Sequence, residues 1–404
     1  MTRGLGAFAL ASMTPAICLI VACLLGGVWP VLAVFSITVM VFLLDKLTGD
    51  DWAAPDDHHG RVLSACLGML HFAVLGAAVW AMGAGTYLSV LDKVLIFTAA
   101  GLWMGQVSNS NAHELIHRAA RWPRRLGVAI YASLLFGHHA SAHPKVHHVH
   151  AATDADPNSA RLGEGFYRFL WRAWAGGFKA GLRAENMTRA RAARELGPLS
   201  HPYLWYVIGA GTALVAAYGL AQTAGVLALI GIASYAQIQL FLSDYVQHYG
   251  LRRQILADGK PEPIGPRHAW NAPHWYSSAM MLNAPRHSDH HMHPSRSFPE
   301  LDLNRDTMPM LPQSVPVMAC VALVPPLWKR VMNPRVGAWM QDAPQPVRAR
   351  DISPAILAAA RKGGLAPANV PVWGHDTDST DNNRPDPDAV SNTASGHSRP
   401  DERG

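Results

Sequence analysis

The sequence predicts an all-α membrane protein: a bundle of six transmembrane helices with a cytoplasmic histidine-rich cap. Half of its 404 residues are hydrophobic and only 15% are charged, which is a membrane composition. The apolar residues are gathered in runs of about 20, the length that a helix needs to cross a bilayer. The 21 histidines are clustered, and most clusters lie outside these runs or at their ends.

Six apolar runs are long enough to span a membrane, and they cover residues 5–26, 28–45, 63–83, 87–111, 203–220 and 223–247. Only a short stretch around Gly26 and Gly27 separates the first two, so we expect a tight helical hairpin there. The apolar run at 126–136 is too short to span. It is expected to lie at the membrane interface or to pack against the bundle.

The basic residues set the expected orientation. The turns at 26–30, 83–87 and 219–223 contain no Lys or Arg, whereas the loops on the other side are rich in both. By the positive-inside rule that second side is cytoplasmic, and both termini lie on it. We therefore expect a multi-pass protein of a bacterial inner membrane, with membrane lipid around it. The net charge of +6 is attributed to this loop bias, with no nucleic-acid partner.

Four groups of histidines on the cytoplasmic side carry the candidate chemistry. The first pair is four residues apart, which puts both imidazoles on one face of a helix. The groups are His113 and His117; His143, His147 and His148; His248 alone; and His287, His290 and His291. Imidazole binds zinc, copper, iron and nickel. Two ions could share nine imidazoles at four or five each, which leaves positions open for oxygen.

The four cysteines form no CxxC pair, and they stand at Cys18, Cys23, Cys66 and Cys320. This spacing argues against a structural zinc site, an iron–sulfur cluster and a fused rubredoxin domain. Electrons for an oxidation must therefore come from another protein.

Two other functions fit part of the pattern. His113-Glu114-x-x-His117 also matches the zinc-protease signature, in which two histidines bind zinc and the glutamate activates water. A membrane-embedded metalloprotease would leave the later histidine groups without a role. A metal transporter would place its ligands near the membrane midplane, whereas these groups cluster at one edge.

The lone intramembrane His71 is expected to be a hydrogen-bonded packing residue.

Together the motifs resemble those of the alkane 1-monooxygenase family, which is related to xylene monooxygenase and, more remotely, to the membrane fatty-acid desaturases. The resemblance covers roughly residues 5–340. It rests on four strings in this order: His113-Glu-Leu-Ile-His117, His143-Pro-Lys-Val-His147-His148, Tyr245-Val-Gln-His248-Tyr-Gly250 and Arg286-His-Ser-Asp-His-His291.

The resemblance implies a membrane di-iron hydroxylase domain, residues 1–340, with a non-haem centre. Such enzymes use dioxygen and two electrons to hydroxylate a terminal carbon, and reduced rubredoxin, served by rubredoxin reductase, brings the electrons. The ligands of the two iron ions would be His113, His117, His143, His147, His148, His248, His287, His290 and His291. A C-terminal extension over 341–362 is expected next. Residues 363–404 are rich in Asp, Asn, Pro and Ser, which predicts a disordered polar tail.

Some neighbours of the motifs depart from the family pattern. Ala142 stands where Glu is usual, Val146 where Gly is usual and Asp244 where Asn is usual. Residues around a ligand tune its basicity and the affinity for the metal. Candidates to orient the imidazoles are Asp154, Asp156, Asp244 and Asp289; a helix cap or a solvated loop residue is the alternative for each.

The expected substrate is a medium-chain alkane or a similar apolar molecule, which only an apolar channel between the helices can hold. It would enter from the lipid and present its methyl carbon where the channel meets the cytoplasmic side. Trp29, Trp80 and Trp103 are candidates for bounding this channel; interfacial anchoring and plain packing are the alternatives.

A basic loop beside the first histidine pair is a candidate docking site for an acidic electron donor such as rubredoxin. It contains Arg118, Arg121, Arg124 and Arg125. The alternative role of these charges is to set the topology of the chain.

Overall fold

The computed structural model describes residues 5–50, 57–193 and 197–341. In this part of the chain the protein is helical, and its extended pairing is limited to two isolated bridges, Ile255 with Pro261 and Asn271 with Met310. The predicted all-α class is thereby confirmed. The described helices belong to one compact unit. The predicted tail, and the predicted extension after its first residue, lie outside the described residues.

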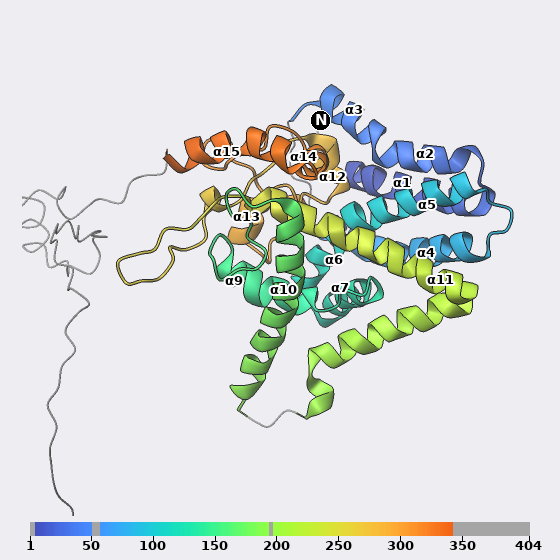
Figure 1. Ribbon diagram of the computed structural model, residues 1–404, viewed down its shortest axis with the longest axis horizontal. Helices are drawn as coiled ribbons and strands as arrows, with labels where there is room; N and C mark the ends of the chain where they lie inside the picture. The colour runs from blue at the N-terminus through green and yellow to red at the C-terminus, as the bar shows by residue number, and fades with distance from the viewer. Residues whose placement is uncertain (1–4, 51–56, 194–196, 342–404) are drawn as a thin grey trace, which may run out of the picture. The chain divides into compact units, whose positions relative to one another are not determined.

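Long apolar helices form the body of this unit (Figure 1), and they are α1 (Gly6–Leu25), α4 (Asp57–Ala84), α5 (Val90–Trp103) and α11 (Pro202–His248). α5 continues through a π-helical turn, η1 (Met104–Ser108), into α6 (Asn109–Ile116). These four segments are long and apolar enough to cross a membrane. The bent pair of α2 (Val28–Ile37) and α3 (Val39–Thr48) makes a fifth candidate span.

The predicted runs at 203–220 and 223–247 form two helical limbs of α11, a segment of 47 residues with a break between the limbs. Its backbone is broken at Ala221, with φ −153°, and at Gln222, with φ 52° and ψ −144°. Figure 1 shows two limbs of α11 that meet at an angle. No proline or charged residue lies between Tyr203 and Ser243, so the helix resumes directly after the break. In the described chain four or five segments are candidate spans, and six crossings stay a prediction.

The tight hairpin predicted between the first two apolar runs is present. Gly26 and Gly27 have φ of 63° and 66°, a conformation that glycine adopts at no steric cost. A Cβ at Gly26 would also lie 2.8 Å from Leu88 Cδ2. Both observations require glycine where α1 turns back into α2.

Two glycines one helical turn apart let α5 and α11 cross closely. A Cβ at Gly105 would lie 2.5 Å from Gln239 Cδ, and a Cβ at Gly101 would overlap the ring of Tyr235. Small residues at such spacing allow helix backbones to approach each other inside membranes. The crossing fixes Tyr235 and Gln239 against the end of α5 and against η1, which leads into the histidine-bearing α6.

Many large apolar side chains on these helices face outward, among them Leu25, Val90, Leu91, Val207 and Val215. Soluble monomers rarely expose such extensive apolar surface. Lipid therefore covers these faces, in agreement with the predicted membrane bundle.

Short elements gather at the end of the bundle that carries the histidines. α7 (Arg121–Ser133) buries Leu126 and Ile130 against the bundle, which is one of the two placements predicted for this run. α10 (Phe166–Ala190) packs on this end and runs across the direction of α1, α4 and α5 in Figure 1. The other short elements are α8 (His139–Ala142), η2 (His143–His147), α9 (His148–His150), η3 (Pro198–Ser200), η4 (Pro266–His268), α12 (Trp275–Met280), α13 (His287–Met292), η5 (Phe298–Glu300), α14 (Val315–Ala322) and α15 (Pro325–Gln341).

Candidate metal centre

Nine histidines from five elements come together at this end of the bundle, and they are the nine singled out from the sequence. α6 supplies His113 and is capped by His117. The last residue of α11 is His248. The remaining six come from η2, α9 and α13, and they are His143, His147, His148, His287, His290 and His291.

The nine imidazoles form two groups, each compact enough to hold a metal ion. Within each group one ring nitrogen per residue lies within 4.8 Å of all the others. The first group is His113, His117, His143, His148 and His290, and the second is His147, His248, His287 and His291. The groups adjoin, because the rings of His148 and His291 are 4.7 Å apart between centroids.

The first group is held together by short contacts between ring nitrogens. Nε2 of His143 lies 2.7 Å from Nε2 of His113 and 2.9 Å from Nε2 of His148. Nε2 of His148 in turn lies 3.1 Å from Nε2 of His290. The fifth member, His117, has a buried Nε2 without a hydrogen-bond partner. Five ring nitrogens therefore face one another.

In the second group three Nε2 atoms form a closed triangle. The sides are 2.9 Å for His248–His287, 3.1 Å for His287–His291 and 3.2 Å for His248–His291. A neutral imidazole nitrogen either donates or accepts, so protons alone leave one side of the triangle without a hydrogen bond. The point equidistant from the three nitrogens lies about 1.8 Å from each, close to a metal–nitrogen bond of about 2.0–2.1 Å. These three nitrogens are therefore better placed to coordinate a cation than to hydrogen bond to one another.

A π-helical turn distributes one histidine motif over both groups. η2 begins at His143 and ends at His147, and its turn is wider than that of an α-helix. His143 and His148 join the first group, whereas His147 joins the second. No pattern in the sequence indicated that the neighbours His147 and His148 belong to different groups.

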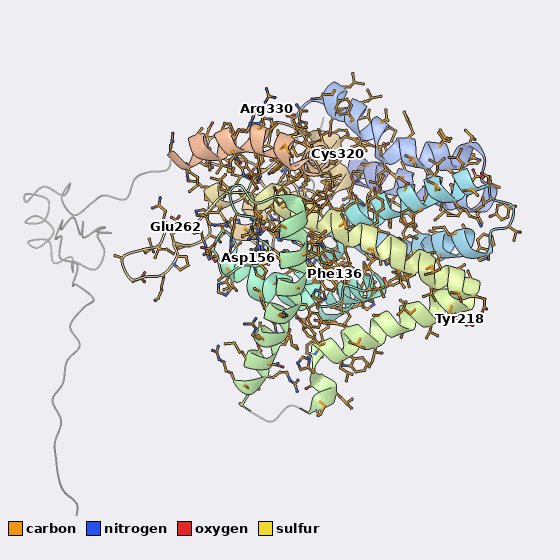
Figure 2. All side chains as sticks on the ribbon, in the orientation of Figure 1. Phe136, Asp156, Tyr218, Glu262, Cys320 and Arg330 are labelled. Atoms are coloured by element: carbon orange, nitrogen blue, oxygen red, sulfur yellow. The ribbon has the colours of Figure 1, made fainter. Side chains whose placement is uncertain are left out.

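A buried carboxylate orients one of the grouped imidazoles. His147 Nδ1 donates to Asp156 Oδ2 over 2.8 Å, close to α10 (Figure 2). Burial lowers the pKa of His147, but the charge and hydrogen bond of Asp156 outweigh it and raise that pKa. Burial raises the pKa of Asp156, but His147 and hydrogen bonds from Ser159 and Asn158 outweigh this effect and lower the pKa. The proton stays on Nδ1 and leaves the lone pair of Nε2 facing the second group.

The other three candidate aspartates do not bond the grouped histidines. The side chain of Asp154 is 81% exposed and lies 3.7 Å from Arg161. Asp244 accepts from Asn158 Nδ2 over 2.6 Å. Asp289 accepts from His293 and Arg296. The prediction that they orient ligands is wrong for these three residues in the described chain.

Burial keeps the surrounding imidazoles neutral. The pKa of His287 is lowered to about 3 by burial and by the charge of His147. The pKa values of His143, His148, His290 and His291 are also lowered, first by burial and then by neighbouring histidines. Neutral imidazole is the form that coordinates metal.

The glutamate of the protease-like signature is engaged elsewhere. Glu114 forms an ion pair with Arg118 and accepts a long hydrogen bond of 3.4 Å from the backbone N–H of Phe298. A protease would need this carboxylate to activate water at the metal.

His71 hydrogen bonds to Ser108 and Ser133 over 2.6 and 2.8 Å, as expected for a packing residue.

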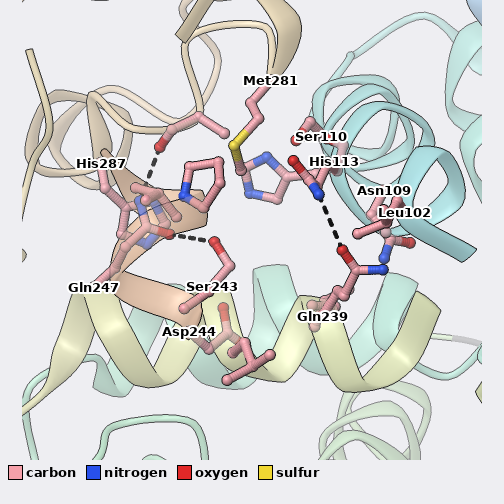
Figure 3. A pocket seen from close by; sticks show the side chains of 18 of the residues that line it. Leu102, Asn109, Ser110, His113, Gln239, Ser243, Asp244, Gln247, Met281 and His287 are labelled. Atoms are coloured by element: carbon pink, nitrogen blue, oxygen red, sulfur yellow. Dashed lines mark hydrogen bonds between the residues drawn. The ribbon is translucent and has the colours of Figure 1, made fainter. Parts of the chain in front are cut away.

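A cavity of about 160 Å³ adjoins the histidines. Its walls come from the α5–η1–α6 segment, from α11 and from α14, and His113, His143 and His287 line one end. Two of its lining residues, Cys320 and Leu323, are exposed, so the cavity opens to the outer surface beside them. Figure 3 shows polar side chains around it, including Gln239, Ser243 and Gln247. These lining residues were not predicted, because glutamines in apolar runs gave no motif.

The three candidate tryptophans do not line this cavity. Trp103 is buried and its indole N–H donates to the carbonyl of Ser12 over 3.0 Å. Trp80 packs near the ring of Tyr87 at 6.2 Å between centroids. Their prediction as channel residues is wrong for this cavity, and packing accounts for Trp80 and Trp103.

Known proteins match the chain over this same region. The fatty acid desaturase family model matches residues 88–321. Alkane 1-monooxygenase 1 of Pseudomonas aeruginosa is 32% identical, with 77% of this chain and 85% of that protein covered. Alkane 1-monooxygenase of Pseudomonas putida is 30% identical, with 74% and 75% covered.

A more distant relative is the xylene/toluene monooxygenase hydroxylase component of Pseudomonas putida, 28% identical, with 65% of this chain and 67% of that protein covered. The residues that the family model matches include all nine histidines. The chain therefore belongs to the alkane 1-monooxygenase family, within the wider fatty acid desaturase family.

Proposed function

We propose that this protein is a membrane monooxygenase that hydroxylates the terminal carbon of a medium-chain alkane or a similar apolar molecule. One oxygen atom of dioxygen would enter the new C–OH bond. The other would leave as water, with two electrons and two protons consumed. The proposal rests on one observation. Two imidazole groups, of five and four histidines, lie beside a cavity that reaches the apolar surface.

We propose two non-haem iron ions as cofactors, one in each imidazole group. The ligands would be His113, His117, His143, His148 and His290 for one ion and His147, His248, His287 and His291 for the other. Bound iron would supply oxygen activation. The chain's own work is to hold the ions, to present the carbon at the end of the cavity and to exclude water.

The apolar environment of the cavity supports entry of the substrate from the membrane. Val315, Ala319 and Leu323 form the wall on the side of α14. An alkane partitions into lipid and has no group that a water-exposed site could recognise. Entry beside α14 would lead its methyl group toward His113 and His143.

Six membrane crossings are part of the proposal, with both termini in the cytoplasm of a bacterial cell and the protein in the inner membrane. α11 has 47 residues, which is about 70 Å of helix and more than twice the hydrocarbon thickness. Its break at Ala221 and Gln222 would divide it into two crossings. With α1, the α2–α3 pair, α4 and the α5–α6 segment, this makes about six.

Reduced rubredoxin, recharged by rubredoxin reductase, is the proposed electron donor. A groove behind η2 contains Arg124, Arg125 and Lys145, with Glu185 as its acidic member. Lys145 lies two residues after His143 and pairs with Glu185 at 2.7 Å. An acidic partner in this groove would come close to the backbone that carries His143 and His147.

The function is tested on the full-length purified protein by metal analysis and a turnover assay. We expect two irons per chain, and 1-octanol from octane when rubredoxin, its reductase and a nicotinamide reductant are supplied. His291→Ala should lower the iron content and abolish turnover. His293→Ala, which changes a histidine outside both groups, should leave both intact. One zinc per chain with peptide cleavage that depends on Glu114 would refute the proposal in favour of the protease.

A further inference from the structure

The cavity contains a glutamine whose amide oxygen has no partner. Gln106 lies on η1 and is 9% exposed. Of the buried side-chain oxygens that line the cavity in the described chain, Gln106 Oε1 is the one without a hydrogen bond. Polar side chains inside a membrane bundle are costly and mark functional sites.

The direction of this amide is fixed by a chain of hydrogen bonds. Gln239 Nε2 donates to the carbonyl of Gly101 over 2.7 Å, so Gln239 presents its oxygen to Gln106. Gln106 Nε2 donates to that oxygen over 3.3 Å, as the dashed line beside Gln239 shows in Figure 3. Reversing Gln106 would bring two amide oxygens together. Its own oxygen is therefore left as an acceptor that needs a donor.

Helix association explains the glutamine pair but not the remaining oxygen. Interhelical hydrogen bonds between amides stabilise membrane bundles, and the Gln106–Gln239 bond is such a contact. Gln247, another amide of the cavity, is paired at both ends: its Nε2 donates to the carbonyl of Ala284 over 3.0 Å, and its Oε1 accepts from Ser243 Oγ over 2.8 Å. Asn109 Nδ2 donates to the carbonyl of Ala236 over 3.0 Å.

We propose that Gln106 Oε1 accepts a hydrogen bond from a hydroxyl carried by the substrate at the end remote from the reacting carbon. Substrates would then include medium-chain primary alcohols, which become terminal diols. The reaction is HO–R–CH₃ + O₂ + 2e⁻ + 2H⁺ → HO–R–CH₂OH + H₂O, with the same oxidant and reductant as for an alkane. This inference rests on the proposed function and narrows its substrate class.

The spacing along the helix supports a chain of medium length. Gln106 precedes His113 by seven residues, about 10 Å of helical rise. Both side chains line the same cavity. A hydroxyl at Gln106 would leave the far end of the chain beside His113 and His143. A bare alkane would leave the amide oxygen buried without a partner, which disfavours its binding.

Equilibrium binding without an electron donor tests the site independently of turnover. For the full-length protein in lipid nanodiscs we expect 1-octanol to bind about tenfold more tightly than octane, equivalent to about 1.4 kcal/mol. In Gln106→Leu this preference should disappear, because leucine gives an apolar wall of similar size. Gln237→Leu, a change on α11 at a glutamine outside the cavity, should keep the preference. Unchanged melting temperatures would show that the variants fold. If Gln106→Leu does not fold, Gln106→Met replaces it in the same measurement.

The alternatives give different outcomes. Equal binding of octane and 1-octanol by the wild type would mean that water fills the site, and it would overturn the proposal. Preferential binding of 1-octanol without 1,8-octanediol formation, while octane is converted to 1-octanol, would mark a product site and overturn the substrate assignment. If neither chain is oxidised although 1-octanol binding depends on Gln106, the proposed function fails while the hydroxyl site stands.

Discussion

His147 and Asp156 form a buried hydrogen-bonded pair, 2.8 Å between Nδ1 and Oδ2, whose other side faces the four-imidazole group. The carboxylate also accepts from Ser159 Oγ over 2.6 Å. It is therefore held in place before any metal arrives. Such partners fix the tautomer of a ligating histidine and raise its basicity.

Asp156→Asn should weaken metal binding at the second group by about 10–100-fold. The amide cannot provide the charge that keeps the proton on His147 Nδ1. Metal titration of the apoprotein, followed by iron analysis, measures the effect. Asp154→Asn changes an exposed aspartate two residues away and should leave both ions bound. Equal affinity in the two variants would contradict a ligand role for His147.

Gly101→Ala should shorten the alkanes that the protein accepts. The new methyl group overlaps the ring of Tyr235, which lines the cavity, and forces it to move. Overpacking of this kind costs about 1–3 kcal/mol, so turnover of the longest substrate should fall by about 10–100-fold. Competition between alkanes of different length, with products separated by gas chromatography, gives the readout.

Gly76→Ala is the matched control for the cavity variant. Gly76 lies in α4, and a Cβ there meets nothing within 4 Å. Alanine should stabilise the helix slightly without changing substrate preference. If both variants give the same product distribution, Tyr235 does not limit the cavity.

The sequence was sufficient to predict the membrane bundle and the nine histidines, because both depend on local patterns. Apolar runs of spanning length and imidazoles at helical spacing are readable without knowledge of the fold. The grouping of His148 with His113, and of His147 with His248, was not predictable. It depends on the wide turn of η2 and on contacts between segments distant in the sequence, such as that of the His113 and His290 rings, 4.3 Å apart between centroids.

The cavity was the part that sequence reasoning placed wrongly. Three tryptophans were predicted as candidates for bounding the channel, but Trp103 is fully buried in the core. The residues that do line it, Gln106 and Gln239, are brought together by the close approach of α5 and α11 at two glycines. The spacing of Gly101 and Gly105 is typical of a close helix crossing, but it does not indicate which helix crosses there or which of its side chains face the cavity.

Reversing charge in the groove behind η2 should slow electron delivery. Arg124→Glu with Arg125→Glu should lower the second-order rate constant for reduced rubredoxin about tenfold at low salt and weaken its salt dependence. Stopped-flow mixing over a range of ionic strength measures both. Lys260→Glu, in an exposed loop at another site, should change neither. A salt dependence identical to that of the wild type would exclude these arginines from donor docking. Their role would then be to set the topology of the chain.

The exposed face of α10 should lie in the membrane interface. Tyr167, Trp171, Trp174 and Phe178 follow one another at helical spacing and are exposed, Trp171 by 71%. Arg168, Lys179 and Arg183 stand beside this stripe and are also exposed. Aromatic and basic residues on one helix that runs across the spanning helices are typical of an interfacial position.

A fluorescent probe at Trp171→Cys tests this placement, in a chain whose native cysteines are changed to alanine. In anionic vesicles the probe should be quenched by brominated lipids and protected from iodide, because the stripe lies among headgroups. The same probe at Arg305→Cys, an exposed residue with an ion pair to Asp50, should show the reverse. Strong iodide quenching at both sites would place α10 in water, and the aromatic stripe would then need a protein partner to cover it.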